Sequence, residues 1–389
     1  MTWMFVICAA LVVYTYAGYP ALLWVLSAIK QRPVAKKSYE PSISIVMAVH
    51  NGTSALARKF ANIRSSDYPA DRLEICVASD GSTDETDSLL ESLAGTVKSV
   101  KCARVGKSAA LNQALALSTG EIVVLADVRQ VIEPTAFKEL AANFADTSIG
   151  CVSGELMFRA NSGGATEGVS LYWQLEKAIR KLESATGSVV GATGALYAVR
   201  RELIPVVPEG TLLDDVFIPL SIQRSGHRVI FEPNARAWDD VAATAGHEFR
   251  RKVRTLAGNF QLLQLAPWAL VNPFTSFRFI SHKLMRLAVP WLLLAVLLIS
   301  YLRFDNPQFR GLAIAQTAAY LMGAATLLWR PLQRVRLANA ASAFIVLNSA
   351  AAVALFSFLR HKQAPTRIWN VQTKVDAAAQ VPKSTQKAG

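Results

Sequence analysis

The stretch SISIVMAVHN, residues 42–51, decides the fold of the central part of this chain. It is a short run of β-branched and apolar residues that ends in the polar pair His50 and Asn51. Two runs of the same kind follow, LEICVA at 73–78 and EIVVLA at 121–126, and helix-like patterns lie between the runs at 55–64, 86–93 and 107–117. Short apolar strands that alternate with helices indicate an α/β domain with a largely parallel sheet.

Carboxylates follow the ends of these predicted strands. Asp80 comes directly after the second strand and Asp127 after the third, while Asp214 and Asp215 precede an apolar helix pattern. In α/β sheets, ligands bind beyond the carboxyl ends of the strands. A turn with a helix N-cap would by itself explain the SDGST sequence at 79–83. Taken together, however, the carboxylates predict a site for a metal-bound, phosphate-bearing ligand.

The N-terminal segment predicts a membrane anchor. An uncharged apolar stretch runs from Trp3 to Ile29, which exceeds the roughly 20 residues that cross the hydrocarbon layer. A cleaved signal peptide has a basic segment before a shorter apolar run, so residues 1–29 are expected to stay as an anchor. The basic residues at 30–37 favour the cytosol for the domain that follows.

The C-terminal part predicts three more spans. The globular composition of residues 38–275 gives way to a region, 287–359, with apolar runs at 287–302, 312–329 and 337–359. The count of spans places the basic tail, 360–389, outside the cell, whereas its charge favours the cytosol. The side of this tail stays open at this point.

Residues 276–286 have the pattern of an amphipathic helix. Arg278, His282 and Arg286 recur every four residues, and apolar side chains occupy the opposite face. This pattern predicts a helix that lies in the membrane interface, and the alternative is the solvated face of a soluble helix.

Composition and the placement of charge indicate whether the chain binds a membrane or nucleic acid. Of the residues, 52% are hydrophobic and 18% charged, and the formal net charge is +13. The excess cations lie mainly at 30–37, 330–337 and 360–389, each beside a long apolar run. This placement fits membrane orientation and anionic headgroups, so nucleic acid is not expected as a partner. The four cysteines form no CxxC pair, which argues against a disulfide framework or a zinc site. A reducing, cytosolic environment is therefore expected for the polar part of the chain.

An ordered series of motifs then makes the chain recognisable. It comprises SIVMAVHN (44–51), DYPADRLEICVASDGSTDET (67–86), GKSAALNQAL (106–115), GEIVVLADVRQ (120–130), GATGALYAVRREL (191–203), LLDDVFIPLSIQRSGHRVIFEP (212–233) and RRKVRTLAGNF (250–260). Over residues 40–370 the chain resembles glycosyltransferase family 2, in the membrane-bound branch that includes chitin-oligosaccharide, hyaluronan, poly-N-acetylglucosamine and cellulose synthases. The resemblance implies a GT-A fold and inverting transfer of a sugar from a nucleotide diphosphate donor, with Mg²⁺ or Mn²⁺ as cofactor.

The resemblance also implies roles for individual residues. Asp127 matches the first position of the DxD motif and so the metal ligand, and Asp215 matches the general base, with Asp214 where the family usually has Glu. The other residues implied at the donor are Asn51, Asp80, Lys107 and Arg129, and those implied at the acceptor side are Gly191, Thr193, Gly194 and Arg254. His50 and His227 are expected to be structural.

Two departures from the family pattern limit what the resemblance implies. The second acid of the DxD motif is replaced by Arg129. Either Asp127 holds the metal together with diphosphate oxygens and water, or Arg129 neutralises the diphosphate directly. A third alternative leaves Arg129 in solvent or bound to an acid within the fold.

In the aligned QxxRW motif Arg254 is kept, but Arg251 and Thr255 replace the glutamine and tryptophan. The loss of an aromatic platform argues against long-chain processivity.

These observations predict an inverting, membrane-integral β-glycosyltransferase of the inner (plasma) membrane with a cytosolic catalytic domain. Its expected partners are a UDP-sugar, a growing surface glycan or lipid-linked acceptor, the lipid bilayer, and subunits of a polysaccharide synthase or export complex. Two alternatives stay open: a single-sugar transferase that acts on polyprenyl phosphate or a glycolipid, and a catalytically weak scaffold subunit of a synthase complex.

Overall fold

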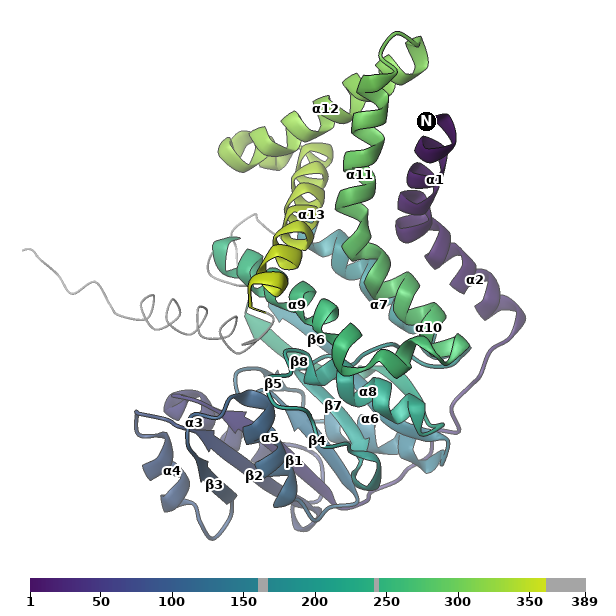
Figure 1. The fold of residues 1–389 in the computed structure, drawn as a ribbon. Helices are drawn as coiled ribbons and strands as arrows, with labels where there is room; N and C mark the ends of the chain where they lie inside the picture. The colour runs from purple at the N-terminus through teal and green to yellow at the C-terminus, as the bar shows by residue number, and fades with distance from the viewer. Residues whose placement is uncertain (160–166, 241–244, 362–389) are drawn as a thin grey trace, which may run out of the picture.

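The computed structural model describes residues 1–159, 167–240 and 245–361 (Figure 1). Except for its first two residues, the predicted tail lies outside these ranges. The described part divides into a mixed α/β domain and a group of long apolar helices. Figure 1 shows the sheet with α3, α4 and α5 at one end of the molecule and α1, α11, α12 and α13 at the other.

A mixed, mostly parallel sheet forms the centre of the domain. Within the described residues it has eight strands in the order β3-β2-β1-β4-β7-β6-β8-β5. β3, β2, β1 and β4 are parallel, β7 is antiparallel to both β4 and β6, β8 is parallel to β6, and β5 is antiparallel to β8. The strands are β1 (Ile43–Val49), β2 (Leu73–Asp80), β3 (Lys98–Cys102), β4 (Ile122–Ala126), β5 (Val131–Ile132), β6 (Ile149–Arg159), β7 (Leu196–Arg200) and β8 (Arg228–Asp240).

The three strands predicted from apolar runs are β1, β2 and β4, and they are neighbours in the sheet. Their side chains are buried on both faces. Val46 of β1 lies in the core cluster with α5 and α8, whereas Ile45 and Met47 lie in the cluster with α3 and α6. A parallel strand that is covered on both faces has no solvent-exposed side chains, so its sequence is a continuous apolar run.

Helices cover both faces of the sheet and connect its strands. The α-helices of the domain are α3 (Thr53–Arg64), α4 (Thr86–Ser92), α5 (Lys107–Ala116), α6 (Ala136–Ala141), α7 (Glu167–Thr186), α8 (Asp214–Arg224) and α9 (Ala245–Leu265). Short 3₁₀ segments lie at Ala70–Arg72, Ala142–Ala145, Arg201–Leu203, Pro267–Leu270 and Arg330–Arg334.

Four helical segments of the described chain are long and apolar enough to cross a membrane: Thr2–Ile29, Pro273–Leu302, Pro307–Leu328 and Arg336–Arg360. The first comprises α1 (Thr2–Val13), a π-helical turn (Tyr14–Gly18) and α2 (Tyr19–Ile29); the others comprise α10 (Pro273–Phe279), a π-helical turn (Ile280–Leu284) and α11 (Met285–Leu302), then α12 (Pro307–Leu328) and α13 (Arg336–Arg360). Many of their large apolar side chains are exposed, such as Trp3 at 81% and Leu328 at 91%. Exposed apolar surface of this extent indicates association with a membrane.

The structure does not separate residues 276–286 from the span that follows them. They belong to one helical segment, Pro273–Leu302, of 30 residues. The apolar run at 287–302 is shorter than the roughly 20 residues that cross the hydrocarbon layer. The helical segment nevertheless is long enough, because it begins before this run, with residues whose polar face packs on the α/β domain. The location of residues 276–286 in the membrane interface stays a prediction.

Candidate active site at the carboxyl edge of the sheet

The loops that follow β1 and β2 are joined into one unit around Asp80. The Asp80 carboxylate oxygen Oδ1 accepts hydrogen bonds from the backbone N–H groups of Val105 and Gly106, at 2.8 and 3.0 Å. Gly106 has a φ of +91°, a conformation that favours glycine. The imidazole Nδ1 of His50 lies 2.9 Å from the Asp80 carbonyl oxygen. His50 therefore contacts the backbone of the neighbouring loop, as a structural role requires.

Asn51 connects the first of these loops to the second. Its side-chain oxygen accepts the backbone N–H of Thr83 at 2.7 Å, and its own backbone N–H donates to the Ser82 hydroxyl at 3.1 Å. Asn51 has a φ of +50°, which asparagine tolerates better than most residues. The sequence-predicted donor residues Asn51 and Asp80 thus lie in adjoining loops at the same edge of the sheet.

Lys107 brings the carboxylates of distant segments together. It is the first residue of α5, and its Nζ lies 3.4 Å from Asp127 Oδ1 and 3.2 Å from Asp214 Oδ1. Although burial lowers the pKa of Lys107, the carboxylates of Asp127, Asp214 and Asp215 hold it well above its usual value. Lys107 therefore stays protonated and offsets part of the negative charge of three acids.

Asp214 and Asp215 are the first residues of α8, against which the predicted acceptor-side segment packs. The backbone N–H of Ala192 donates to the Asp215 carbonyl oxygen at 2.8 Å. A Cβ atom added to Gly194 would lie 3.0 Å from Asp215 Oδ2, and one added to Gly191 would lie 3.0 Å from Val216. These two glycines therefore allow the segment to approach α8 closely.

The environment of Asp215 makes its carboxylate more basic. Burial and the neighbouring Asp214 charge raise the pKa of Asp215 to about 6, and Lys107 offsets part of this effect. A carboxylate with a raised pKa near neutral pH is suited to take a proton. Arg254, in α9, faces the same charges: burial lowers the pKa of its guanidinium, while Asp127, Asp215 and Asp214 oppose the change.

Arg129 forms an ion pair with an acid inside the fold. Its Nη2 lies 2.6 Å from Asp239 Oδ2 at the end of β8, and Gln130 Nε2 donates to the same oxygen at 3.1 Å. The Asp239 side chain is only 3% exposed, whereas that of Arg129 is 65% exposed. Of the three arrangements considered for Arg129, the structure contains the pairing with an internal acid.

Sequence reasoning missed two residues beneath this loop. Asp239 is one, and Lys59 of α3 is the other: it is 2% exposed and donates to the Gln130 carbonyl oxygen. Burial lowers the pKa of Lys59 to about 8, against the opposing charges of Asp127 and Asp239. Neither residue belongs to a motif. By sequence alone, a buried lysine in an amphipathic helix cannot be distinguished from a lysine that is exposed to solvent.

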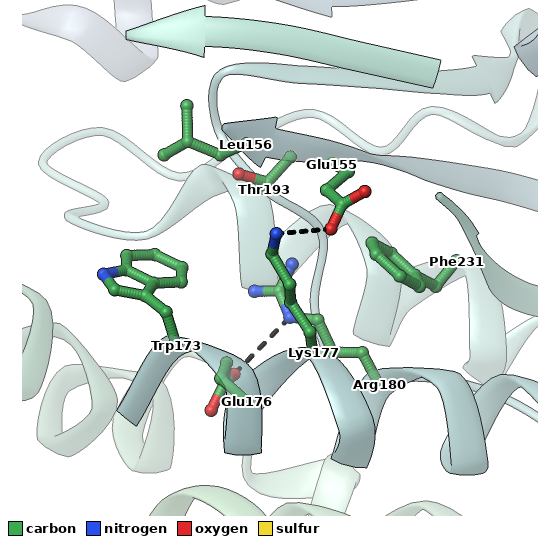
Figure 2. Close-up of a pocket in the computed structure, with 8 residues that line it drawn as sticks. All are labelled: Glu155, Leu156, Trp173, Glu176, Lys177, Arg180, Thr193 and Phe231. Atoms are coloured by element: carbon green, nitrogen blue, oxygen red, sulfur yellow. Dashed lines mark hydrogen bonds and ion pairs between the residues drawn. The ribbon is translucent and has the colours of Figure 1, made fainter. Parts of the chain in front are cut away.

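A small polar cavity adjoins the acceptor-side segment (Figure 2). Thr193 lines it from that segment, and its N–H donates to the Ser153 hydroxyl at 3.0 Å. In Figure 2, Lys177 extends from α7 toward Glu155 of β6, and Trp173 of the same helix also lines the cavity. Lys177 Nζ lies 2.7 Å from Glu155 Oε1. Thr193 thus lies between this cavity and Gly194, which borders Asp215.

The described residues contain no group of three or more His, Cys, Asp and Glu side chains that could hold a metal ion by themselves. The Asp127 carboxylate is 42% exposed and lies 3.4 Å from Lys107 Nζ. Mg²⁺ in phosphate-binding sites takes one or two protein carboxylates and completes its shell with phosphate oxygens and water. The donor set fits that mode of binding, with Asp127 as the protein ligand.

The sequence of residues 44–206 matches the model of glycosyl transferase family 2. These residues form a family 2 glycosyltransferase domain. The match covers β1 to β7 and contains Asp80, Lys107 and Asp127; Asp214 and Asp215 follow it directly in the chain. The enzyme class that the motifs predicted, a glycosyltransferase, is confirmed.

Curated relatives point to the same class. The chain is 25% identical over 281 residues to a β-monoglucosyldiacylglycerol synthase of Synechocystis, a match that covers 66% of this chain and 57% of the relative. It is 23% identical over 230 residues to a poly-β-1,6-N-acetyl-D-glucosamine synthase of Staphylococcus aureus, covering 57% of this chain and 55% of the relative. The matched part therefore spans a little over half the length of each relative.

A solved structure confirms the GT-A fold. The mannosyltransferase PcManGT from Pyrobaculum calidifontis, determined with GDP-Man and Mn²⁺, superposes with a TM-score of 0.70 at 24% identity. The superposition covers 92% of this chain and 99% of that one. The predicted combination of a GT-A-like domain with long apolar helices is therefore confirmed.

Proposed function

We propose that this glycosyltransferase is an inverting, membrane-integral enzyme that moves a sugar from a UDP-sugar to a glycan or lipid-linked acceptor at the membrane face. The observation that carries the proposal is the cluster formed by Lys107, Asp127, Asp214 and Asp215, four charged residues of three separate segments at one edge of the sheet. The glycosyltransferase family supplies the reaction class, and the long apolar helices support the membrane location.

The donor occupies the side of the site formed by the loops after β1, β2 and β4. Asp80 and Asn51 hold the nucleoside, and Lys107 lies close enough to Asp127 to stabilise the diphosphate. Mg²⁺ or Mn²⁺ held by Asp127 supplies positive charge to the leaving diphosphate when it is bound. The structure of PcManGT was determined with GDP-Man and Mn²⁺, which supports a nucleotide-sugar and a divalent cation as the ligands of this site.

Asp215 acts as the general base for the acceptor. The acceptor hydroxyl oxygen attacks the anomeric carbon and its proton passes to the Asp215 carboxylate. The bond between the anomeric carbon and the diphosphate oxygen breaks, and its electron pair leaves with the nucleoside diphosphate. Base catalysis by a positioned carboxylate contributes typically about 10²–10⁴-fold. A Cβ atom at Gly194 would lie 3.0 Å from Asp215 Oδ2, so the glycine leaves this carboxylate oxygen uncovered by a side chain on that side.

Release of nucleoside diphosphate tests the proposal against the scaffold alternative. The purified protein in lipid nanodiscs is mixed with a panel of UDP-sugars and, for comparison, GDP-mannose. An enzyme releases the diphosphate from at least one donor, and Asp215→Asn abolishes transfer but binds the nucleotide with nearly wild-type affinity. Wild-type protein that releases no diphosphate from any donor contradicts the proposed function, and a variant with more than about a tenth of wild-type turnover removes Asp215 as the base.

A single-sugar transferase that acts on polyprenyl phosphate or a glycolipid is the second candidate. One relative is a β-monoglucosyldiacylglycerol synthase, an enzyme that is named for a glycolipid. In this chain, Arg251 and Thr255 stand where processive synthases carry a glutamine and a tryptophan. Chromatography of the labelled product separates the alternatives, since a glycolipid partitions into organic solvent and a long glycan does not.

A further inference from the structure

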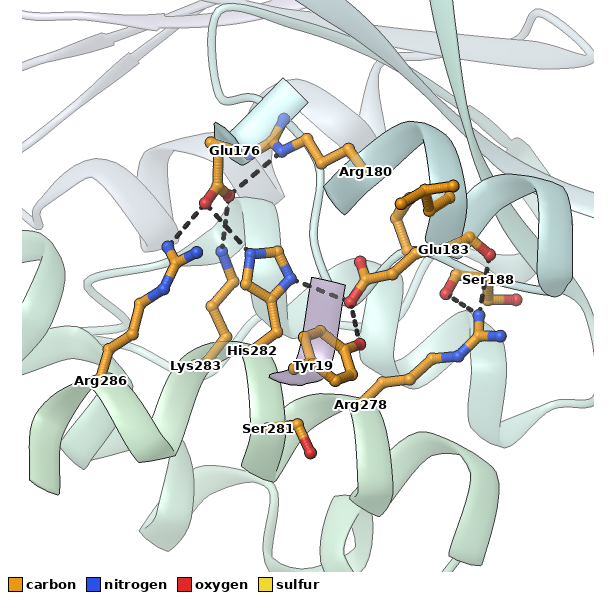
Figure 3. Close-up of polar contacts among 12 residues, drawn as sticks. Tyr19, Glu176, Arg180, Glu183, Ser188, Arg278, Ser281, His282, Lys283 and Arg286 are labelled. Carbon is orange, nitrogen blue, oxygen red and sulfur yellow. Dashed lines mark hydrogen bonds and ion pairs between the residues drawn. The ribbon is translucent and has the colours of Figure 1, made fainter. Parts of the chain in front are cut away.

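The polar face of the segment Pro273–Leu302 is buried against α7 (Figure 3). The two ring nitrogens of His282 bridge the glutamates of α7, with Nε2 3.1 Å from Glu176 and Nδ1 3.0 Å from Glu183. Arg286 Nη1 donates to Glu176 at 2.6 Å, and the Tyr19 hydroxyl donates to Glu183 at 2.6 Å. Two candidate membrane spans are thereby fixed to one helix of the catalytic domain.

Arg278 extends this contact to the end of α7. Its guanidinium donates to the carbonyl oxygen of Glu183 at 2.9 Å, to the hydroxyl of Thr186 at 2.9 Å, and to the carbonyl oxygen of Ser188. α7 ends at Thr186, so the last carbonyl groups of the helix have no backbone N–H partner within it. The planar guanidinium has five donors in a fixed fork and can satisfy several such acceptors together.

Ser188 begins the segment that leads to the base. Three residues further along, Gly191 packs on α8, and Ala192 donates its N–H to the Asp215 carbonyl oxygen at 2.8 Å. Gly194 then approaches the Asp215 carboxylate. An arginine of a candidate membrane span therefore holds one end of a short segment whose other end touches the base.

A second contact from the same helix reaches the same two elements. The Thr275 hydroxyl lies 3.4 Å from Gln223 Oε1, and Gln223 Nε2 donates to the Val189 carbonyl oxygen at 2.9 Å. Gln223 lies in α8, the helix that begins with Asp214 and Asp215. Helix α10 thus contacts both sides of the boundary between the acceptor-side segment and α8.

We propose that Arg278 is a positioning residue for the acceptor step, because it fixes residues 188–194 against Asp215 and so sets where an acceptor hydroxyl meets the base. This inference rests on the proposed function. Within the described residues, the donor residues lie elsewhere, at the end of β2 (Asp80), at the start of α5 (Lys107) and directly after β4 (Asp127), and they make no hydrogen bond or ion pair with Arg278. Loss of Arg278 is therefore expected to impair transfer to the acceptor without impairing nucleotide binding.

Hydrogen exchange tests the structural part of the inference without any substrate. In Arg278→Gln, the amides of residues 188–194 exchange at least about tenfold faster than in the wild type, because the segment loses one of the contacts that hold it. Arg286→Gln is the matched control: it breaks the contact with Glu176 in the same cluster, and it leaves exchange in residues 188–194 unchanged. Equal exchange in Arg278→Gln and wild type, or equal acceleration in both variants, overturns the inference.

Kinetics tests the functional part. The protein is reconstituted in vesicles of lipids from its expression host, which supply acceptors, and given the UDP-sugar from which it releases UDP fastest. For Arg278→Gln the ratio of transfer to donor hydrolysis falls by about 10- to 100-fold, as expected for a misplacement on the order of 1 Å, while UDP affinity stays unchanged. Arg286→Gln keeps the wild-type ratio. An unchanged ratio in Arg278→Gln overturns the inference.

Thr186→Val provides a milder variant in case Arg278→Gln does not fold. It removes a single acceptor of the guanidinium and is expected to change exchange and the transfer ratio in the same direction but by less. If Arg278→Gln does not fold and Thr186→Val changes neither the exchange rates nor the transfer ratio, the inference is overturned. If the wild type releases nucleotide from no donor, the proposed function fails, and the exchange measurement alone decides the role of Arg278.

Discussion

The acid limb of the pH–rate profile gives a quantitative test of the environment of Asp215. The general base must be ionised, so transfer is lost as the pH falls through its pKa. Burial and the Asp214 charge raise that pKa from 3.8 to about 6. Half of the plateau rate is therefore expected near pH 6, and about a tenth of it at pH 5.

Asp214→Asn removes one of the causes of the raised pKa of Asp215. Burial is the largest cause and the Asp214 charge is the second, while Lys107 opposes both. The acid limb of the variant should therefore move to lower pH, and at pH 5 the variant should keep a larger fraction of its own plateau rate than the wild type does. Each tenfold change in the ionisation constant corresponds to about 1.4 kcal/mol. The direction is downward because removal of a neighbouring negative charge makes the carboxylate ionise more easily.

The assay measures transfer of labelled sugar from pH 4.5 to 8 for wild type, Asp214→Asn and Glu209→Gln, each normalised to its own plateau. Glu209 is an exposed acid before α8, and its replacement should leave the limb in place. A wild-type limb near pH 4, or a limb that moves upward in Asp214→Asn, would refute the assignment of Asp215 as a base whose pKa is raised by burial and by Asp214.

Three further predictions follow from the donor side and from the topology. Asp80→Ala is expected to weaken UDP affinity, because the loop around Val105 and Gly106 loses its acceptor; calorimetry that finds unchanged affinity removes Asp80 from the donor site. Arg129→Ala removes the ion pair with Asp239 and should change turnover across a Mg²⁺ and Mn²⁺ titration, whereas overlapping curves for Arg129→Ala, Arg129→Asp and wild type would mean that Arg129 has no part in handling the diphosphate. Cysteines introduced at exposed sites within 38–275 should resist labelling from outside intact cells, and efficient labelling there reverses the proposed orientation.

Much of the fold was predictable because its signals are local. Strands β1, β2 and β4 are buried on both faces and read as apolar runs, and the spans read as long uncharged runs. Strand β3, KSVKC, was missed because it lies at the edge of the sheet and carries two lysines. The carboxylates after the strands were found because a parallel sheet brings its carboxyl ends to one edge.

The sequence alone therefore determined the fold class, the candidate membrane spans and the residue types of the candidate site, since each depends on a few neighbouring residues. The tertiary structure alone decided which charges meet. Arg129 pairs with Asp239, which lies 110 positions away, and Arg278 bonds the end of α7 rather than headgroups or solvent. The periodicity of residues 276–286 shows that a polar face exists, but a cationic face is stabilised equally by lipid phosphate, water or a buried carboxylate. Only the contact of the segment Pro273–Leu302 with α7, made by His282 and Arg286, excludes water and selects Glu176 and Glu183 as partners.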